Sequence, residues 1–129
     1  MTIFSKIVAG EIPCHKIAET ADFLAFLDVN PVAKGHTLVI PKREIDYIFD
    51  LDDALYVGLM QFAKTLAPAL EAVVPCQRIG LSIIGLEVPH AHVHLIPLNR
   101  MSDMDFGKKI KMSAEELAEL AEAIRGKMV

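Results

Sequence analysis

The chain contains few cysteines and no tryptophan. Its two cysteines, Cys14 and Cys76, are too few for a disulfide framework in 129 residues, so we expect them to be reduced thiols of an intracellular protein. Residues 1–6 lack the apolar stretch of a secretory signal peptide. Together these observations predict a cytoplasmic location.

Long apolar runs and a surplus of basic residues are also missing. No uninterrupted apolar run approaches the roughly 18 residues that span a bilayer, which argues against a membrane partner. The 17 acidic residues outnumber the 13 basic ones, which argues against binding a nucleic-acid polymer but leaves a single nucleotide open. The composition is nevertheless 53% hydrophobic, with a mean hydropathy of +0.38. We expect this apolar excess to form the interface of a homodimer.

Several motifs that bind phosphate or supply a nucleophile are absent. The chain has neither a Gly-rich Walker loop nor a Gly-x-Gly-x-x-Gly fingerprint. It has no Gly-x-Ser-x-Gly elbow, and Cys14 stands in no catalytic signature. The sequence therefore gives no support to a P-loop, dinucleotide-binding or α/β-hydrolase reading.

The first two thirds of the chain alternate between short apolar runs and one long helical pattern. We expect a helix over residues 2–9, stopped by Gly10, and strands over residues 23–27 and 36–40. A long helix follows, and Pro68 is expected to kink or split it. Its apolar stripe consists of Leu55, Leu59, Phe62, Leu66, Leu70 and Val73.

The remainder predicts a hairpin and a last helix. Residues 78–84 favour a strand, Gly85 and Pro89 bracket a short turn, and a second strand follows at once, so the two should pair antiparallel. A capping box at Ser113 and Glu116 begins a last helix. The order of elements predicts an α+β fold with a mainly antiparallel sheet.

Three histidines alternate along that second strand. His90, His92 and His94 are separated by Ala91 and Val93. Because successive side chains of a strand point to opposite faces, the apolar residues should face a core and the imidazoles should share the other face. Three histidines on one face indicate a site that handles protons, phosphate or a metal.

Three interpretations of the histidines stay open on the residues alone. In phosphoryl chemistry the central histidine attacks phosphorus through one ring nitrogen, while the other nitrogen keeps its proton and donates a hydrogen bond to a fixed acceptor. In a metal site two histidines bind zinc or iron, and Glu87 or His36 completes the ligand set. In the third interpretation the histidines are incidental surface residues.

The histidine run also resembles a known family. Residues 90–96 match the pattern His-φ-His-φ-His-φ-φ, in which φ is apolar, of the histidine-triad (HIT) superfamily. Residues 2–13 are similar to the opening of its Hint branch, and residues 26–31 and 35–42 follow in the family order. These segments together cover most of residues 2–98.

The resemblance implies a fold and an activity. The implied fold is α+β: a five-stranded antiparallel sheet forming a half-barrel, with a long central helix, a short N-terminal helix and a C-terminal helix. It implies one HIT domain over residues 1–129, with the helix at 113–126 as an extension, and a homodimer whose sheets join. The implied reaction is hydrolysis or transfer at the α-phosphate of an AMP-like purine nucleotide conjugate, such as a nucleoside phosphoramidate, through a nucleotidyl-histidine intermediate and without a cofactor or metal.

The resemblance also implies roles for individual residues. His92 is the implied nucleophile, His94 and His36 would contact phosphate or assist the leaving group, and His90 would support His92. Asp28 would accept hydrogen bonds from the ribose hydroxyls. The other implied nucleotide-binding residues are Phe4, Ile7, Phe26, Leu27, Val29, Ser82, Glu87 and Val88.

One departure from the family pattern suggests a substrate preference. Gly85-Leu86-Glu87 stands where the Hint branch usually has Gly-Gln followed by Ser or Thr, so Glu87 replaces a hydroxyl with a carboxylate. We hypothesise that Glu87 selects a cationic leaving group such as an amine. A nucleotide-binding module with little catalysis, or a histidine-rich metalloprotein, remain as alternative functions.

Overall fold

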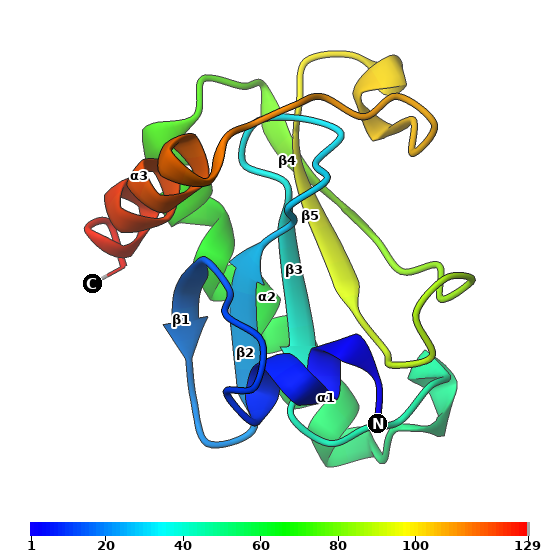
Figure 1. Ribbon diagram of the computed structural model, residues 1–129. Coiled ribbons are helices and arrows are strands. Elements are labelled where there is room, and N and C mark those ends of the chain that lie inside the picture. Colours follow the sequence, from blue (N-terminus) through cyan, green and yellow to red (C-terminus); the bar gives the residue numbers. More distant parts are fainter. Residues whose placement is uncertain (129) are drawn as a thin grey trace.

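In the computed structural model, which describes residues 1–128, the chain forms an open five-stranded antiparallel sheet and three α-helices (Figure 1). The strands are β1 (Lys16–Glu19), β2 (Phe23–Leu27), β3 (Thr37–Pro41), β4 (Arg78–Ser82) and β5 (Val93–Leu98), in the spatial order β1-β2-β3-β5-β4. The helices are α1 (Ile3–Val8), α2 (Asp53–Val73) and α3 (Ala114–Arg125), with short 3-10 helices at Ile48–Asp50 and Met101–Met104. These elements confirm the predicted α+β class and the antiparallel sheet.

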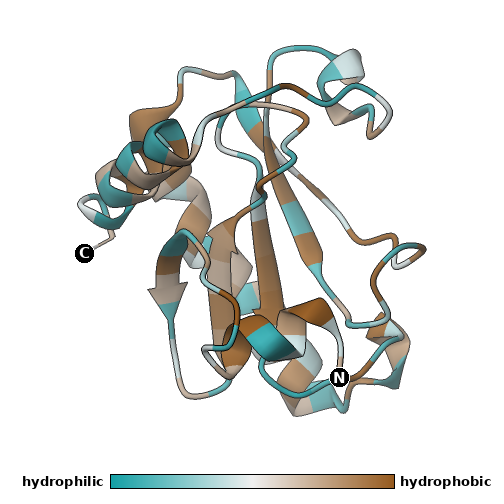
Figure 2. Cartoon of the chain, in the orientation of Figure 1, coloured by the Kyte–Doolittle hydropathy of each residue, from teal (hydrophilic) through white to brown (hydrophobic). Residues whose placement is uncertain are grey.

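The central strands carry apolar residues on both faces, because each face is covered. On β2, Phe23, Ala25 and Leu27 pack with α2 and α3, whereas Leu24 and Phe26 pack with α1. β3 alternates in the same way, and all five residues of each strand are buried. Figure 2 shows the brown apolar colour along both strands. The sheet is thus held rigidly from both sides.

Helix α2 lies against one face of the sheet (Figure 1). The side chain of Asp52 caps its first turn by accepting a hydrogen bond of 2.8 Å from the Leu55 amide. The predicted stripe is confirmed, since Leu55, Leu59, Leu66 and Leu70 are buried. The helix is not split at Pro68, which lies inside one continuous element.

Helix α1 crosses the opposite face, and α3 packs beside α2 (Figure 1). Thr2 caps α1 by accepting a hydrogen bond from the Ser5 amide, and Gly10 adopts a φ of +81° just beyond the helix. The capping box of α3 forms as predicted, with Ser113 and Glu116 bonded reciprocally. Helix α3 with its two caps, Ser113 and Gly126, matches the expected helix at 113–126. Val129 lies outside the described residues.

Two expectations about the strands were wrong or incomplete. The strand β1 was not predicted, because its four residues contain one buried apolar side chain, Ile17, and no clear alternation. The histidine strand begins only at Val93, and residues 83–92 form a long loop instead of a tight turn. The physical reason is that the Ala91 amide donates to the Ile45 carbonyl, at 2.7 Å, and not to β4. His90 and His92 therefore precede the strand.

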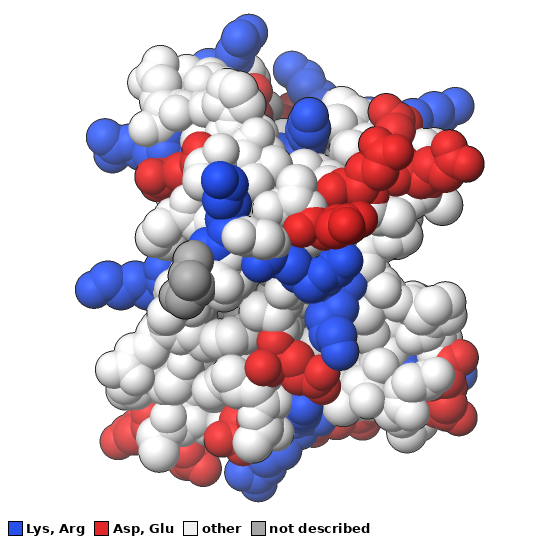
Figure 3. Space-filling model, turned by 90° about the vertical axis from the view of Figure 1, so that its left-hand side faces the viewer, with Lys and Arg blue, Asp and Glu red and all other residues white. Residues whose placement is uncertain are grey.

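The surface carries charges of both signs. On the face shown in Figure 3, acidic and basic side chains both occur, with uncharged surface between them. A single basic patch, as a nucleic-acid polymer would require, does not cover this face. Within residues 1–128, no helix combines the length and the apolar character needed to cross a bilayer.

Candidate functional site

A cavity of about 650 Å³ lies between α1, the start of β3, and the loops at residues 28–30 and 84–88. Most of the residues that the sequence implied for nucleotide binding line it: Phe4, Ile7, Phe26, Leu27, Asp28, Val29, Glu87 and Val88. Leu27 reaches the cavity from the end of β2, although it also belongs to the core on the other face of the sheet. Segments that are far apart in the sequence thus form one pocket.

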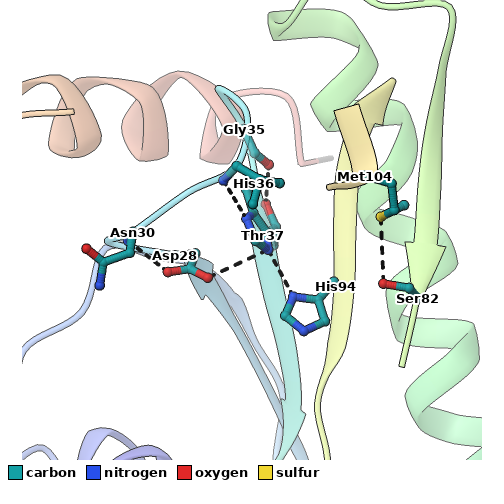
Figure 4. A network of polar contacts seen from close by, with 9 residues as sticks. Asp28, Asn30, Gly35, His36, Thr37, Ser82, His94 and Met104 are labelled. Atoms are coloured by element: carbon teal, nitrogen blue, oxygen red, sulfur yellow. Dashed lines mark hydrogen bonds and ion pairs between the residues drawn. The ribbon is translucent and has the colours of Figure 1, made fainter. Parts of the chain in front are cut away.

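Ser82 was expected in this pocket but does not line it. The register of β4 places Ser82 opposite His94, and its hydroxyl faces the Met104 sulfur, at 3.7 Å (Figure 4). The loop that follows β4 carries Glu87 and Val88 into the cavity instead.

The four candidate histidines divide into two groups. His92 and His94 line the cavity, whereas His36 and His90 are buried behind them with 1% and 0% exposure. The interpretation of incidental surface histidines is therefore wrong. The expected alternation is confirmed for the apolar partners, since Ala91, Val93 and Leu95 belong to the core beside α2.

The backbone fixes which nitrogen of His92 carries a proton. His92 Nδ1 lies 2.7 Å from the carbonyl oxygen of His90. A carbonyl oxygen can only accept, so Nδ1 is the donor, and in the neutral ring Nε2 keeps its lone pair. Phe4 packs edge-on against this ring, with centroids 5.1 Å apart. His92 is thereby held as a ring with a free Nε2 at a cavity wall.

His36 and His94 form a directed hydrogen-bond chain (Figure 4). The Val32 amide donates to His36 Nδ1, at 3.1 Å, so the proton of neutral His36 resides on Nε2. His36 Nε2 lies 2.9 Å from His94 Nδ1 and 3.6 Å from Asp28 Oδ2. His36 therefore donates to His94, and His94 carries its own proton on Nε2, the nitrogen that remains free.

Burial keeps these histidines neutral near pH 7. It lowers the pKa of His36 to about 4, helped by the nearby charges of Lys109 and His92. It lowers the pKa of His94 to about 3, with His92 and His36 adding to the effect. Burial also raises the pKa of Asp28, which the backbone amide of Asn30 partly opposes. His94 is thus suited to donate a hydrogen bond from Nε2 to an anion without bearing charge.

The same cluster is the part of the structure in which a metal could be considered. Ligand atoms of Asp28, His36 and His94 lie within 4.8 Å of one another. A metal would need the lone pair of His36 Nε2, yet the Val32 amide already occupies Nδ1 and leaves the ring proton on Nε2. The hydrogen-bond directions fit proton-bearing rings better than a metal site.

Two lining residues come from a segment that the sequence analysis did not connect with the site. Phe106 packs against His94 and His36, with ring centroids 4.7 and 6.0 Å apart. Lys109 is exposed but lines the cavity, and its Nζ lies 5.9 Å from the Phe106 centroid. In the sequence, the adjacent Lys108 and Lys109 are typical of solvated surface charge. No local pattern could have placed it here, because the approach is set by the Ile110 amide bonding to the Pro31 carbonyl.

The depressed histidine pKa values predict a loss of stability in mild acid. Between about pH 6.5, the ordinary value, and about pH 4, the unfolded chain binds protons that folded His36 and His94 refuse. Stability is therefore complete above pH 6.5 and falls as the pH decreases, by on the order of 1 kcal/mol per pH unit for each histidine. Urea unfolding of the wild type and of His36→Asn/His94→Asn at several pH values measures this slope.

The double variant should show a shallower decline than the wild type over this range. His15→Asn serves as the control, because His15 lies outside the cavity, and it should retain the wild-type slope. Equal slopes in the wild type and the double variant would contradict the assignment of buried neutral rings.

Comparisons with known proteins agree with this geometry. A model of the HIT domain matches residues 9–101. The chain is 39% identical to the adenosine 5'-monophosphoramidase of Schizosaccharomyces pombe, over 98% of this chain and 97% of that protein. It is 38% identical to the adenosine 5'-monophosphoramidase of Saccharomyces cerevisiae, over 92% of this chain and 82% of that protein.

Solved structures give the same result. A HIT-like protein from Bartonella henselae superposes with a TM-score of 0.85 at 30% identity, covering 97% of this chain and 94% of that one. A zinc-bound histidine triad family protein from Mycobacterium smegmatis superposes with a TM-score of 0.84 at 25% identity, covering 98% and 91%. Sequence, fold and the buried histidine cluster therefore agree that this chain belongs to the HIT family.

Proposed function

We propose that this protein hydrolyses nucleoside phosphoramidates, or related AMP-like purine nucleotide conjugates, at the α-phosphate. The observation that carries the proposal is the bond from His92 Nδ1 to the His90 carbonyl, which leaves Nε2 as the nucleophilic nitrogen at the cavity. Family membership and the two relatives named as adenosine 5'-monophosphoramidases support the reaction class.

The reaction proceeds in two displacements at phosphorus. His92 Nε2 forms a bond to the α-phosphorus, the bond from phosphorus to the leaving nitrogen breaks, and that nitrogen takes a proton from water to depart as an amine. Water then attacks the phosphorus of the nucleotidyl-histidine, and the bond from phosphorus to His92 Nε2 breaks, which releases the nucleotide and restores the ring. The proton that this water loses neutralises the hydroxide left by the first step. His94 Nε2–H donates to a phosphoryl oxygen. Apart from water, every group in this scheme comes from the chain, and no metal or cofactor is needed.

The remaining cavity suits a nucleoside. Asp28, at the end of β2, would accept hydrogen bonds from the ribose hydroxyls. The apolar walls contributed by Phe4, Ile7, Phe26 and Val88 would enclose the base, and Val29 lies at the rim with 58% exposure. We further propose that the reaction takes place in the cytoplasm.

A single substitution tests the nucleophile. His92→Asn should retain the fold and bind AMP, but turnover of an adenosine 5'-monophosphoramidate should fall at least a thousandfold because the attacking nitrogen is gone. Rapid quenching of the wild type followed by mass spectrometry should find a nucleotidyl group on the peptide that contains His92. A wild type that binds AMP without ever forming this adduct would favour a nucleotide-binding module instead.

Glu87 offers a test of leaving-group preference. It is exposed and lines the cavity, so its carboxylate can attract a cationic amine conjugated to the nucleotide. Glu87→Ser should reduce kcat/KM for conjugates of cationic amines about threefold to tenfold more than for neutral conjugates. An unchanged ranking of leaving groups would refute the role of Glu87, whereas the assignment of His92 would stand.

We also propose that two copies associate through the edge strand β4. The outer edge of β4 has no strand partner in the described chain, and an apolar groove of about 410 Å³ lies between β4 and α2. Leu81 is 43% exposed in this groove. Unpaired edges and exposed apolar grooves favour association, which accounts for the apolar excess of the composition.

Light scattering coupled to size exclusion measures this association. The wild type should have the mass of a dimer at micromolar concentration, and Leu81→Asp should shift it to a monomer by placing a charge in the interface. Met101→Asp is the control, because Met101 is 91% exposed and lies outside the groove. A monomeric wild type, or an effect equal in both variants, would contradict the proposal.

A further inference from the structure

A network of polar side chains outside the cavity connects helix α1 to the histidine cluster. It consists of Thr2, Ser5, Glu44 and the imidazole of His90. These residues come from the N-terminal cap of α1, the loop after β3 and the segment before β5, with Thr2 and His90 lying 88 positions apart. The reaction scheme above assigns no step to Glu44.

The direction of each hydrogen bond follows from the buried end of the network. His90 Nε2 lies 2.8 Å from the Pro41 carbonyl, which can only accept, so Nε2 bears the proton and Nδ1 accepts. Thr2 Oγ1 lies 2.9 Å from Nδ1 and donates to it. The same hydroxyl accepts from the Ser5 amide, at 3.0 Å, as the cap of α1. The cap of the helix and the tautomer of His90 are thereby linked.

Glu44 closes the outer end of the network. Its Oε1 accepts from the Thr2 amide, at 2.6 Å, and from the Ser5 hydroxyl, at 2.7 Å. The Ser5 hydroxyl, and then the Thr2 amide, lower the pKa of Glu44, so it is an acceptor only. The Ser5 hydroxyl also lies 3.4 Å from His90 Nδ1. Because Ser5 donates its single hydroxyl proton to Glu44, the donor to His90 Nδ1 is Thr2 and not Ser5.

The network is connected to His92 in three ways. The imidazole of His90 is held at both nitrogens, which fixes the backbone whose carbonyl accepts from His92 Nδ1. The helix that Glu44 anchors also carries Phe4, which packs against both His90 and His92. In addition, the Ile45 carbonyl, next to Glu44, accepts from the Ala91 amide.

From this geometry we propose that Glu44 is a positioning residue for His92: it holds the first turn of α1 against His90 so that the His90 carbonyl keeps the ring of His92 in its Nδ1–H form. Glu44 does not line the cavity. The proposal rests on the proposed function for its kinetic consequence, but the tautomer of His92 can be measured without any substrate.

The test compares Glu44→Ala with Glu44→Gln, since the glutamine oxygen can still accept both hydrogen bonds. Glu44→Ala should lower kcat for an adenosine 5'-monophosphoramidate about tenfold and change KM less than twofold. Glu44→Gln should recover kcat to within about threefold of the wild type. Glu119→Ala, which removes an exposed carboxylate on α3, is the matched control and should leave kcat unchanged.

Nitrogen-15 NMR of the histidine side chains provides the readout that a purely structural role would not move. The wild type and Glu44→Gln should show His92 protonated at Nδ1, and Glu44→Ala should show a mixture of tautomers. A Glu44→Ala protein that melts at a lower temperature but keeps kcat and the His92 signals would overturn the proposal, as would equal impairment of both Glu44 variants. If the wild type turns over no phosphoramidate, the proposed function fails, while the NMR comparison still decides the role of Glu44.

Discussion

The bond from His92 Nδ1 to the His90 carbonyl is the interaction on which the site depends. A neutral imidazole has one proton, so the partner of Nδ1 determines what Nε2 can do. A side-chain acceptor at this place could rotate or change its protonation, whereas a backbone carbonyl can do neither. The remaining structure around residue 90 keeps that carbonyl in place: the Pro41 carbonyl and Thr2 hold the imidazole, and the Ala91 amide is bonded to Ile45.

This precision is possible because the sheet beneath the site is packed on both faces. β2 and β3 are fully buried. They carry Phe26 and Leu38, which line the cavity from one face of the sheet, and Asp28 lines it directly after the end of β2. Side chains mounted on strands of a closely packed core have little freedom to shift. The loop at residues 83–92, by contrast, adds the more exposed walls at Leu86 and Glu87.

The sequence predicted those features that depend on local periodicity. The stripe of α2, the capping box at Ser113, and the alternation of Ala91, Val93 and Leu95 are each visible in a few consecutive residues and were confirmed. What could not be predicted depends on long-range bonds. The start of β5 at Val93 follows from the bond between Ala91 and Ile45, and the approach of Lys109 follows from the bond between Ile110 and Pro31. The residue pattern and the resemblance to the HIT family indicated most of the residues that line the cavity. The hydrogen-bond partner of each histidine ring nitrogen could be identified only in the folded chain.

Neutral and charged side chains occupy different environments around the cavity. His36 and His94 are neutral at pH 7 because burial opposes their protonation, so they contribute N–H dipoles and not positive charge. In the proposed reaction, a phosphate at His92 would meet the fixed Nε2–H donor of His94 in a region where an ionised histidine would be costly. The positive charge is supplied by Lys109, which stays exposed beside Phe106. An exposed cation attracts an anionic substrate without the desolvation penalty that a buried one would pay. Lys109 would therefore attract an anionic substrate from a distance, and His94 would position its phosphate at close range. The charged residue is exposed to water, and the buried residue is neutral.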